Sequence, residues 1–198
     1  MRISLPTGFL DSVAVKKFIS TVKVQYPYIQ LQLIPNDEIA DLMSEQIDIA
    51  IRAAEPDPNS SLVARYLTQW RLCICASPDY LAEKPIHTVA DLRSRTWINY
   101  HDTIFRNTFA FLGLGDMPLE NPVSCSSIIA SRSLAIAGFG LTLLLSKEVE
   151  KFINNRELAI VLPEIEMPSY NLYAVTAHRV QSAKIEGILQ LLKRSFEE

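Results

Sequence analysis

The sequence has few of the residues that characterise disulfide-bonded or metal-binding proteins. It contains three cysteines, Cys73, Cys75 and Cys125, and this odd number excludes complete internal pairing. A reducing compartment is the better interpretation. Cys73 and Cys75 share one face of a predicted strand, as half of a metal site or, more commonly for free cysteine, as two small buried residues. The histidines lie far apart, so we predict no metal site.

Long apolar segments and a strong charge of one sign are also missing. The longest apolar stretch, residues 134–145, contains two glycines and falls short of the roughly 20 residues of a membrane helix. The first six residues contain no apolar signal core. The formal net charge of -3 argues against a free-standing nucleic-acid-binding protein. We therefore expect a soluble, cytoplasmic protein with no membrane partner. The chain opens directly on a predicted strand at 2–5, which is typical of a segment of a longer protein.

The motifs of common enzyme classes are absent. Gly138 and Gly140 lack the third glycine of a dinucleotide fingerprint, and no phosphate loop, Gly-x-Ser-x-Gly or His-Glu-x-x-His motif occurs. The adjacent carboxylates Asp37 and Glu38 sit where a helix cap and a first-turn acid belong. A Ser/His/Asp triad is not excluded, because any chain of this length holds these residues. We predict a protein that is not an enzyme and has no cofactor.

Alternating strand and helix patterns fill the first 52 residues. Strands are predicted at 2–5, 29–34 and 47–52, with a helix at 12–26 and a short helix after Asn36 and Asp37. This order favours a parallel α/β sheet. Farther on, the pattern predicts strands at 62–67 and 71–76, helices that begin near 78, 128, 147 and 182, and no clear element at 101–121. The strongly apolar strands 72–76 and 172–177 could pair and cross between two lobes.

Small polar residues occupy the predicted turns between strands and helices. They are Thr7 and Gly8, Asn36 and Asp37, Ser77, and Ser126 and Ser127. Free backbone N–H groups at helix starts bind anions, and ligands of open α/β sheets sit outside the carboxyl ends of the strands. These turns could converge on one small, often acidic molecule. Each turn taken alone is better explained as an ordinary helix cap.

Several runs of the sequence resemble one protein family. Asp-Ile-Ala-Ile-Arg at 48–52, Ser-Ser-Leu-Val-Ala-Arg at 60–65 and Ala-Ser-Pro-x-Tyr-Leu at 76–81 are similar to the effector-binding domain of LysR-type transcriptional regulators. The runs at 135–141 and 172–179 fit the second half of that domain. The resemblance covers essentially the whole chain, in order.

The resemblance implies the type II periplasmic-binding-protein fold, an α/β fold of two lobes joined by two crossing strands. Lobe one would comprise residues 1–74 and 174–198, and lobe two residues 75–173. The family's winged helix-turn-helix domain would be absent from this chain, so promoter DNA would be bound only through that missing N-terminal domain. The chain itself would sense a small-molecule effector and form a head-to-tail homodimer or a higher homo-oligomer, with Val24 and an edge strand at 29–34 as candidate contacts.

The family's effector lies in the cleft between the lobes, and the turns around it map onto residues of this sequence. These are Thr7, Gly8 and Phe9, Asn36 and Asp37, Ala53 and Ala54, Ser77, Tyr100 and His101, and Ser126 and Ser127. An organic acid is mildly preferred as the effector. Arg52 and Arg65 could clamp a carboxylate, but they belong to general family runs, which favours a structural role.

Two alternatives on the same fold stay open. An exported solute-binding protein would require a signal sequence, and none is seen. An enzyme, such as a deaminase or a dehydratase-like hydrolase, would require turnover that depends on Ser126 or His101. The sequence also departs from the family at Thr142, Leu144 and Leu145, and segment 101–121 matches no part of the pattern. The effector is therefore left unidentified.

Overall fold

The computed structural model describes residues 1–38, 42–54, 57, 60–115, 123–179 and 182–197. The chain forms two compact units: unit 1 comprises Met1–Trp70 and Ser169–Glu198, and unit 2 comprises Arg71–Pro168. The chain passes between them inside strand β4 (Val63–Ala76) and again immediately before β9 (Ser169–Thr176). These junctions lie four and five residues before the lobe boundaries expected from the sequence, 74 and 173.

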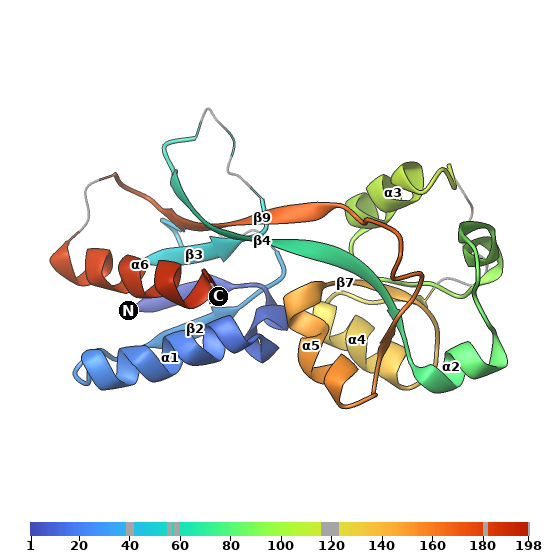
Figure 1. Ribbon diagram of the computed structural model, residues 1–198. Helices are drawn as coiled ribbons and strands as arrows, with labels where there is room; N and C mark the ends of the chain where they lie inside the picture. The colour runs from blue at the N-terminus through green and yellow to red at the C-terminus, as the bar shows by residue number, and fades with distance from the viewer. Residues whose placement is uncertain (39–41, 55–56, 58–59, 116–122, 180–181, 198) are drawn as a thin grey trace. The chain divides into compact units, whose positions relative to one another are not determined.

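Unit 1 is built on a mixed sheet. Its strands are β1 (Arg2–Leu5), β2 (Gln32–Pro35), β3 (Ile49–Arg52), β9 and the first part of β4, in the order β2-β1-β3-β9-β4. β1 pairs in parallel with both β2 and β3, while β3 and β9 are antiparallel (Figure 1). β2 stands at the end of this order, so the prediction of an edge strand is confirmed, although the strand begins three residues later than expected.

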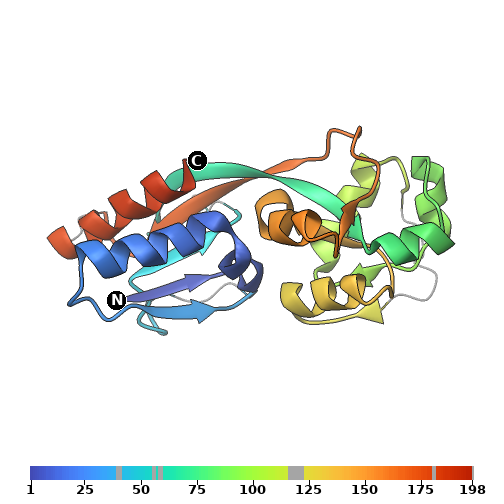
Figure 2. The ribbon, with the colours of Figure 1, turned by 60° about the horizontal axis from the view of Figure 1, so that its bottom comes forward.

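Two helices, α1 (Val13–Gln25) and α6 (Ala183–Phe196), lie side by side over the unit 1 sheet (Figure 2). Ser12 and Ser182 cap them, since each hydroxyl accepts a hydrogen bond from the backbone N–H three residues later. The buried stripe of α1 consists of Val15, Phe18 and Val22. This spacing confirms the helix that the apolar periodicity predicts.

An aromatic cluster anchors the turn after β1 to the core of unit 1. The Trp70 ring lies 4.7 Å from that of Phe9 and 5.7 Å from that of Phe196, between ring centroids. All three side chains are buried. They come from the 3-10 helix at Thr7–Asp11, from β4 and from α6. Burial of three large rings therefore fixes the position of this turn.

Unit 2 surrounds the second part of β4. This strand pairs antiparallel with β7 (Thr142–Leu145) and β8 (Ala159–Ile160), and β5 (Ile98–Asn99) pairs in parallel with β6 (Val123–Ser124). A parallel bridge between Trp97 and Leu141 connects the two groups. The helices are α2 (Pro78–Glu83), a 3-10 helix at Val89–Ser94, α3 (Asp102–Phe111), α4 (Ile128–Ile136) and α5 (Ser146–Asn154).

Tertiary packing changes some of the predicted elements. The strands predicted at 62–67 and 71–76 form one continuous β4, because the connecting residues stay extended and bury Trp70. The helix predicted to begin near 147 is α5, which begins at Ser146, and Leu145 takes its cap position without a side-chain hydrogen bond.

Two further predictions fall partly on residues outside the described part of the chain. The Asp37 carboxylate accepts hydrogen bonds from Thr7, and residues 39–41 of the short helix predicted after it lie outside the described residues. Segment 101–121, which had no predicted element, begins with α3. Its residues 116–121 are again outside the described part of the chain.

Gly140, which connects α4 to β7, has no room for a side chain. A Cβ atom there would overlap the carbonyl oxygen of Thr96, which accepts a hydrogen bond from the Leu141 N–H at 2.9 Å. We expect Gly140→Ala to lower the free energy of unfolding by about 2–3 kcal/mol, because the obstacle is backbone. Urea unfolding measures the loss.

Gly113→Ala is the matched control for this variant. The φ angle at Gly113 is also positive, at 68°, but nothing lies within 4 Å of its Cβ position. Its cost is then the left-handed conformation alone, about 1 kcal/mol. Equal losses in the two variants would contradict the steric explanation.

Candidate functional site

The carboxyl ends of β1, β2 and β3 meet at one edge of the unit 1 sheet, because β1 is parallel to both neighbours. Leu5 is in register with Pro35, so the residues two positions farther on, Thr7 and Asp37, meet. The Thr7 N–H donates to Asp37 Oδ1 at 2.7 Å, and the Thr7 hydroxyl donates to Asp37 Oδ2 at 2.7 Å. The structure therefore brings together two of the predicted site residues.

This contact changes the chemistry expected of the first turn. The sequence suggests the Thr7 N–H as a donor to an anionic ligand. In the structure this N–H donates instead to a carboxylate of the protein itself. Hydrogen bonds to an ionised group are roughly twice as strong as neutral ones. The turn after β1 is thus braced by Asp37, and it presents a negative charge at this edge.

The other predicted residues of unit 1 take different positions around that edge. Gly8 and Phe9 are buried in the 3-10 helix after β1, and the Phe9 ring is used by the core. The Asn36 side chain accepts a hydrogen bond from the Glu38 N–H at 3.0 Å, which closes the turn after β2. Ala53 and Ala54 form the bend after β3, the first half-buried and the second exposed.

Unit 2 has a second edge of this kind, since β5 and β6 are also parallel. Asn99 organises the turn after β5: its Oδ1 accepts from the His101 N–H at 2.8 Å, and its Nδ2 donates to Asp102 at 2.5 Å. The Cys125 N–H donates to the Asn99 carbonyl at 2.9 Å. These bonds tie the turn after β5, with exposed His101, to the turn after β6, which holds Ser126 and Ser127.

The predicted serines divide into caps and open side chains. Ser77 is buried and accepts a hydrogen bond from the Tyr80 N–H at 3.2 Å, and Ser127 accepts one from the Ala130 N–H at 3.1 Å. Both are N-caps, as the alternative interpretation holds. Ser126 is exposed, and its hydroxyl has no hydrogen bond to a residue that the structure describes. Ser126 is thus open to a ligand in a way that the two caps are not.

Both arginines considered as carboxylate clamps are engaged within unit 1. Arg65 donates to the Thr176 hydroxyl at 2.9 Å and so connects β4 to the end of β9. Arg52 donates to the Ser4 hydroxyl at 3.4 Å. Burial lowers the pKa of its guanidinium, and the charge of Glu45 opposes that shift. These contacts support the structural role that the sequence favours.

The cysteines belong to the core of unit 2. Cys73 and Cys75 are buried in β4, and Cys125 packs against the same cluster. Burial raises the pKa of both Cys73 and Cys75, so these thiols stay protonated at neutral pH. Among the described residues, no group of three or more His, Cys, Asp or Glu side chains could hold a metal ion. Within the same residues, no helix is long and apolar enough to cross a membrane.

Sequence reasoning missed the polar groups that support the unit 2 edge. Ser131 of α4 and Thr142 of β7 are buried, share a short hydrogen bond, and lie 3.3 and 3.2 Å from the Ile98 carbonyl oxygen. Asn99 ends strand β5, and its side chain bonds to the backbone two residues farther on, as asparagine commonly does in turns. Tyr100, which was expected in the site, is half-buried, and its ring contacts Phe105 edge-on.

Parallel strands that end in polar turns, repeated in two α/β units, are the organisation of a small-molecule-binding domain. The model of the LysR substrate binding domain matches residues 2–197. The chain belongs to this family, as its sequence runs indicate.

Curated relatives of the chain are transcriptional regulators. The HTH-type transcriptional regulator PtxR of Pseudomonas aeruginosa is 26% identical over 202 residues, which cover 98% of this chain and 63% of PtxR. DmlR of Escherichia coli is 29% identical over 209 residues, covering 100% of this chain and 66% of DmlR. The chain therefore spans less than two thirds of the length of these relatives. They support the regulator interpretation over a transport protein.

Solved structures confirm the predicted type II periplasmic-binding-protein-like fold. The regulatory domain of CrgA from Neisseria meningitidis superimposes with a TM-score of 0.84 at 24% identity, covering 99% of this chain and 98% of that one. The effector domain of AmpR from Pseudomonas aeruginosa gives a TM-score of 0.81 at 17% identity, covering 100% and 95% of the two chains. At these identities the likeness concerns the fold alone.

The hydrogen bonds between Thr7 and Asp37 are expected to stabilise unit 1. Thr7→Val removes the hydroxyl donor and keeps the N–H, so we expect a loss of about 1–2 kcal/mol in the free energy of unfolding. In an Asp37→Asn background the same substitution costs less, and a double-mutant cycle measures this coupling. Thr103→Val, at an exposed position of α3, is the control. Additive effects at positions 7 and 37 would contradict the contact.

Proposed function

We propose that the chain is the effector-sensing domain of a LysR-type transcriptional regulator, and that it binds a small-molecule effector at the strand-end turns. The parallel pairing of β1 with β2 and β3, and of β5 with β6, carries this proposal. It gathers polar turn residues at one edge of each sheet, where ligands of such folds bind. The family match and the regulator relatives support it.

The strand-end turns of each unit favour a particular kind of polar group on a ligand. In unit 2, the exposed Ser126 and His101 side chains can donate hydrogen bonds, and the N-terminus of α4 beside them attracts negative charge. In unit 1, the Asp37 carboxylate favours a donor. An organic acid therefore suits the unit 2 edge, and a molecule with a hydroxyl or amino group suits the unit 1 edge.

Regulation would follow from differential binding. A ligand shifts an equilibrium between two states only by the difference in its affinity for them. The effector would stabilise one state of the domain, and a winged helix-turn-helix domain outside this chain would bind promoter DNA. Such a regulator acts in the cytoplasm, and it needs no chemical step on its effector.

A homodimer is the second part of the proposal. Val13 and Val24 are 69% and 81% exposed on one side of α1, away from its buried stripe, and Tyr28 just beyond the helix is 99% exposed. β2 is an edge strand of the same unit. Exposed apolar side chains beside an open strand edge are typical of an interface. A single monomeric species in sedimentation at high micromolar concentration would contradict the dimer.

Thermal unfolding of the 198-residue chain with a panel of small hydroxy and amino acids tests effector binding. A ligand that binds the native state alone stabilises it by RT ln(1 + [L]/Kd), about 2.7 kcal/mol at a hundred times Kd. We expect one member of this chemical class to raise Tm in proportion to the logarithm of its concentration.

Two neighbouring serines give the matched variants. Ser126→Ala should leave Tm of the free chain unchanged and weaken effector binding by about fivefold to tenfold, since it removes one hydrogen bond. Ser127→Ala should lower the free energy of unfolding by about 1 kcal/mol, since it removes the α4 cap. Effector affinity that is unchanged in Ser126→Ala would contradict the proposed site.

A further inference from the structure

Two buried charges in the core of unit 2 are not used by the proposed effector site. Arg132 of α4 is 5% exposed and Glu148 of α5 is 2% exposed, and no other charged side chain is buried among the residues that the structure describes. Arginine and glutamate are almost never fully buried unless they are paired. These two residues therefore need an explanation that charges at the surface do not.

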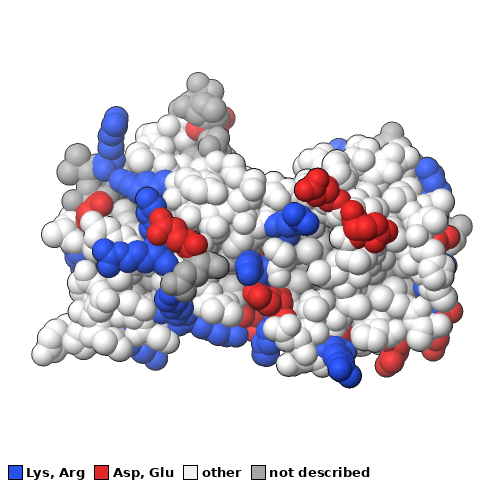
Figure 3. All heavy atoms as spheres, in the orientation of Figure 1, with Lys and Arg blue, Asp and Glu red and all other residues white. Residues whose placement is uncertain are grey.

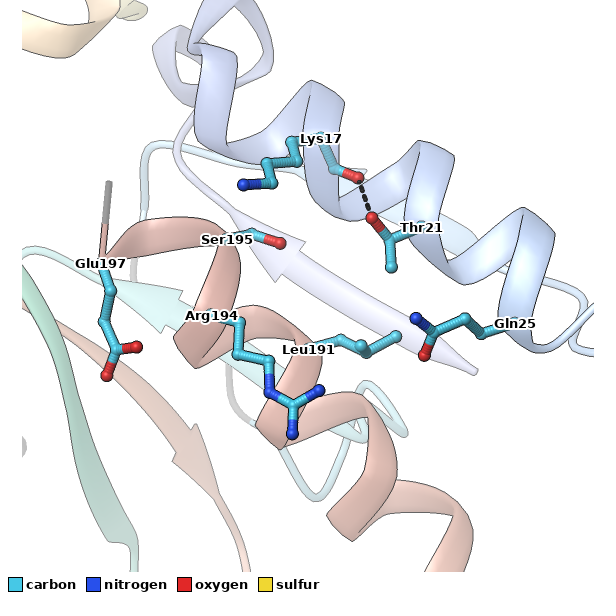
Figure 4. Close-up of a pocket in the computed structure, with 7 residues that line it drawn as sticks. All are labelled: Lys17, Thr21, Gln25, Leu191, Arg194, Ser195 and Glu197. Atoms are coloured by element: carbon cyan, nitrogen blue, oxygen red, sulfur yellow. Dashed lines mark hydrogen bonds between the residues drawn. The ribbon is translucent and has the colours of Figure 1, made fainter.

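The other described charges keep contact with solvent. Figure 3 shows Lys and Arg side chains interspersed with Asp and Glu on the surface. In unit 1, Lys17 and Arg194 line a groove of about 410 Å³ between α1 and α6 (Figure 4), and both side chains are exposed. Charges of this kind stay hydrated, whereas a buried charge loses its hydration and has to be compensated by groups of the protein.

Arg132 is stacked on an aromatic ring of α5. Its guanidinium carbon lies 4.3 Å from the centroid of the Phe152 ring, which is within the range of a cation–π contact. Glu148 lies one turn before Phe152, on the same buried face of α5. Burial and, to a smaller extent, the charge of Glu148 raise the pKa of Cys73 and Cys75, so this carboxylate lies near β4. The stacked contact thus connects α4 to α5 inside the core.

A second polar anchor of α4 lies directly before Arg132. The Ser131 hydroxyl donates to the Ile98 carbonyl oxygen at 3.3 Å, so Ser131 attaches α4 to β5 while Arg132 attaches it to α5. Successive residues of a helix point about 100° apart, and the two anchors therefore act in different directions. A helix held in two directions has little freedom to rotate about its own axis.

The start of α4 lies close to both anchors. Its cap, Ser127, precedes them by little more than one helical turn. The turn directly before this cap holds Ser126, and the Cys125 N–H ties that turn to the Asn99 carbonyl at 2.9 Å. A rotation of α4 would therefore move Ser126 relative to His101, which lies on the turn after β5.

We infer that Arg132 is a positioning residue for the unit 2 edge: its stacking on Phe152 fixes the rotation of α4 and so holds Ser126 in line with the His101 turn. An apolar side chain of similar length would fill the same space without the cost of burying a charge. The planar guanidinium adds a contact with one preferred geometry, which such a side chain lacks. The inference rests on the proposed effector function, because a ligand at this edge is what makes the position of Ser126 matter.

Amide hydrogen exchange of the 198-residue chain, measured by heteronuclear NMR without ligand, tests this role. The Cys125 N–H reports on the link between the two turns, and the Ile98 N–H, which donates to the Leu141 carbonyl at 2.8 Å, reports on the core of unit 2. We expect Arg132→Met to accelerate exchange at Cys125 about tenfold more than at Ile98, since it removes a desolvated cation–π contact and opens the turn locally. Lys151→Met is the matched control: the exposed Lys151 amine lies 5.2 Å from the centroid of the same ring, and its loss should change neither rate.

A double variant, Arg132→Met with Glu148→Gln, separates positioning from stability. Arg132→Met alone leaves Glu148 as the one buried charge among the described residues, so Tm should fall by about 10 °C. The double variant removes both charges, so Tm should recover while exchange at Cys125 stays fast, because the stacking is still absent. An acceleration at Cys125 no larger than at Ile98, or slow exchange at Cys125 in the double variant, would overturn the positioning role. No ligand takes part, so its failure is distinguishable from failure of the effector site, which Ser126→Ala reports.

Discussion

Parallel pairing of β1 with both of its neighbours is the constraint on which the candidate site depends. This pairing places the carboxyl ends of β1, β2 and β3 at one edge of the unit 1 sheet. The register of Leu5 with Pro35 then brings Thr7 into contact with Asp37. The pairing of Asn99 with Ser124 does the same in unit 2, where it aligns the turns that hold His101 and Ser126. A shift of one residue in either register would separate these groups.

Buried groups hold these turns in place. In unit 1, the ring of Phe9, two residues after Thr7, packs on Trp70. In unit 2, the Ser131 and Thr142 hydroxyls anchor α4 and β7 at the Ile98 carbonyl, one residue before Asn99. A turn fixed in this way loses little conformational entropy when a ligand binds. The structure thus supplies preorganised positions with few charged groups, which suits a sensor of small molecules whose binding must remain reversible.

Local patterns in the sequence predict much of this fold. The ends of α1 and α6 follow from Ser12 and Ser182 and from apolar spacing, and the family runs predict the overall class. Contacts between residues that are distant in the sequence do not follow from these local patterns. Asp37 has the local signature of a helix cap, yet it bonds to Thr7 thirty positions earlier. Ser126 and Ser127 are equivalent in sequence, and the start of α4 decides which one is the cap.

Amide chemical-shift mapping of the chain, with an effector found by thermal unfolding, tests the central claim most directly. The account predicts that the largest shifts occur at the strand-end turns, at Thr7, Asp37, His101 and Ser126, and that helices α1 and α6 are unaffected. Largest shifts within these two helices, with none at the strand ends, would contradict it.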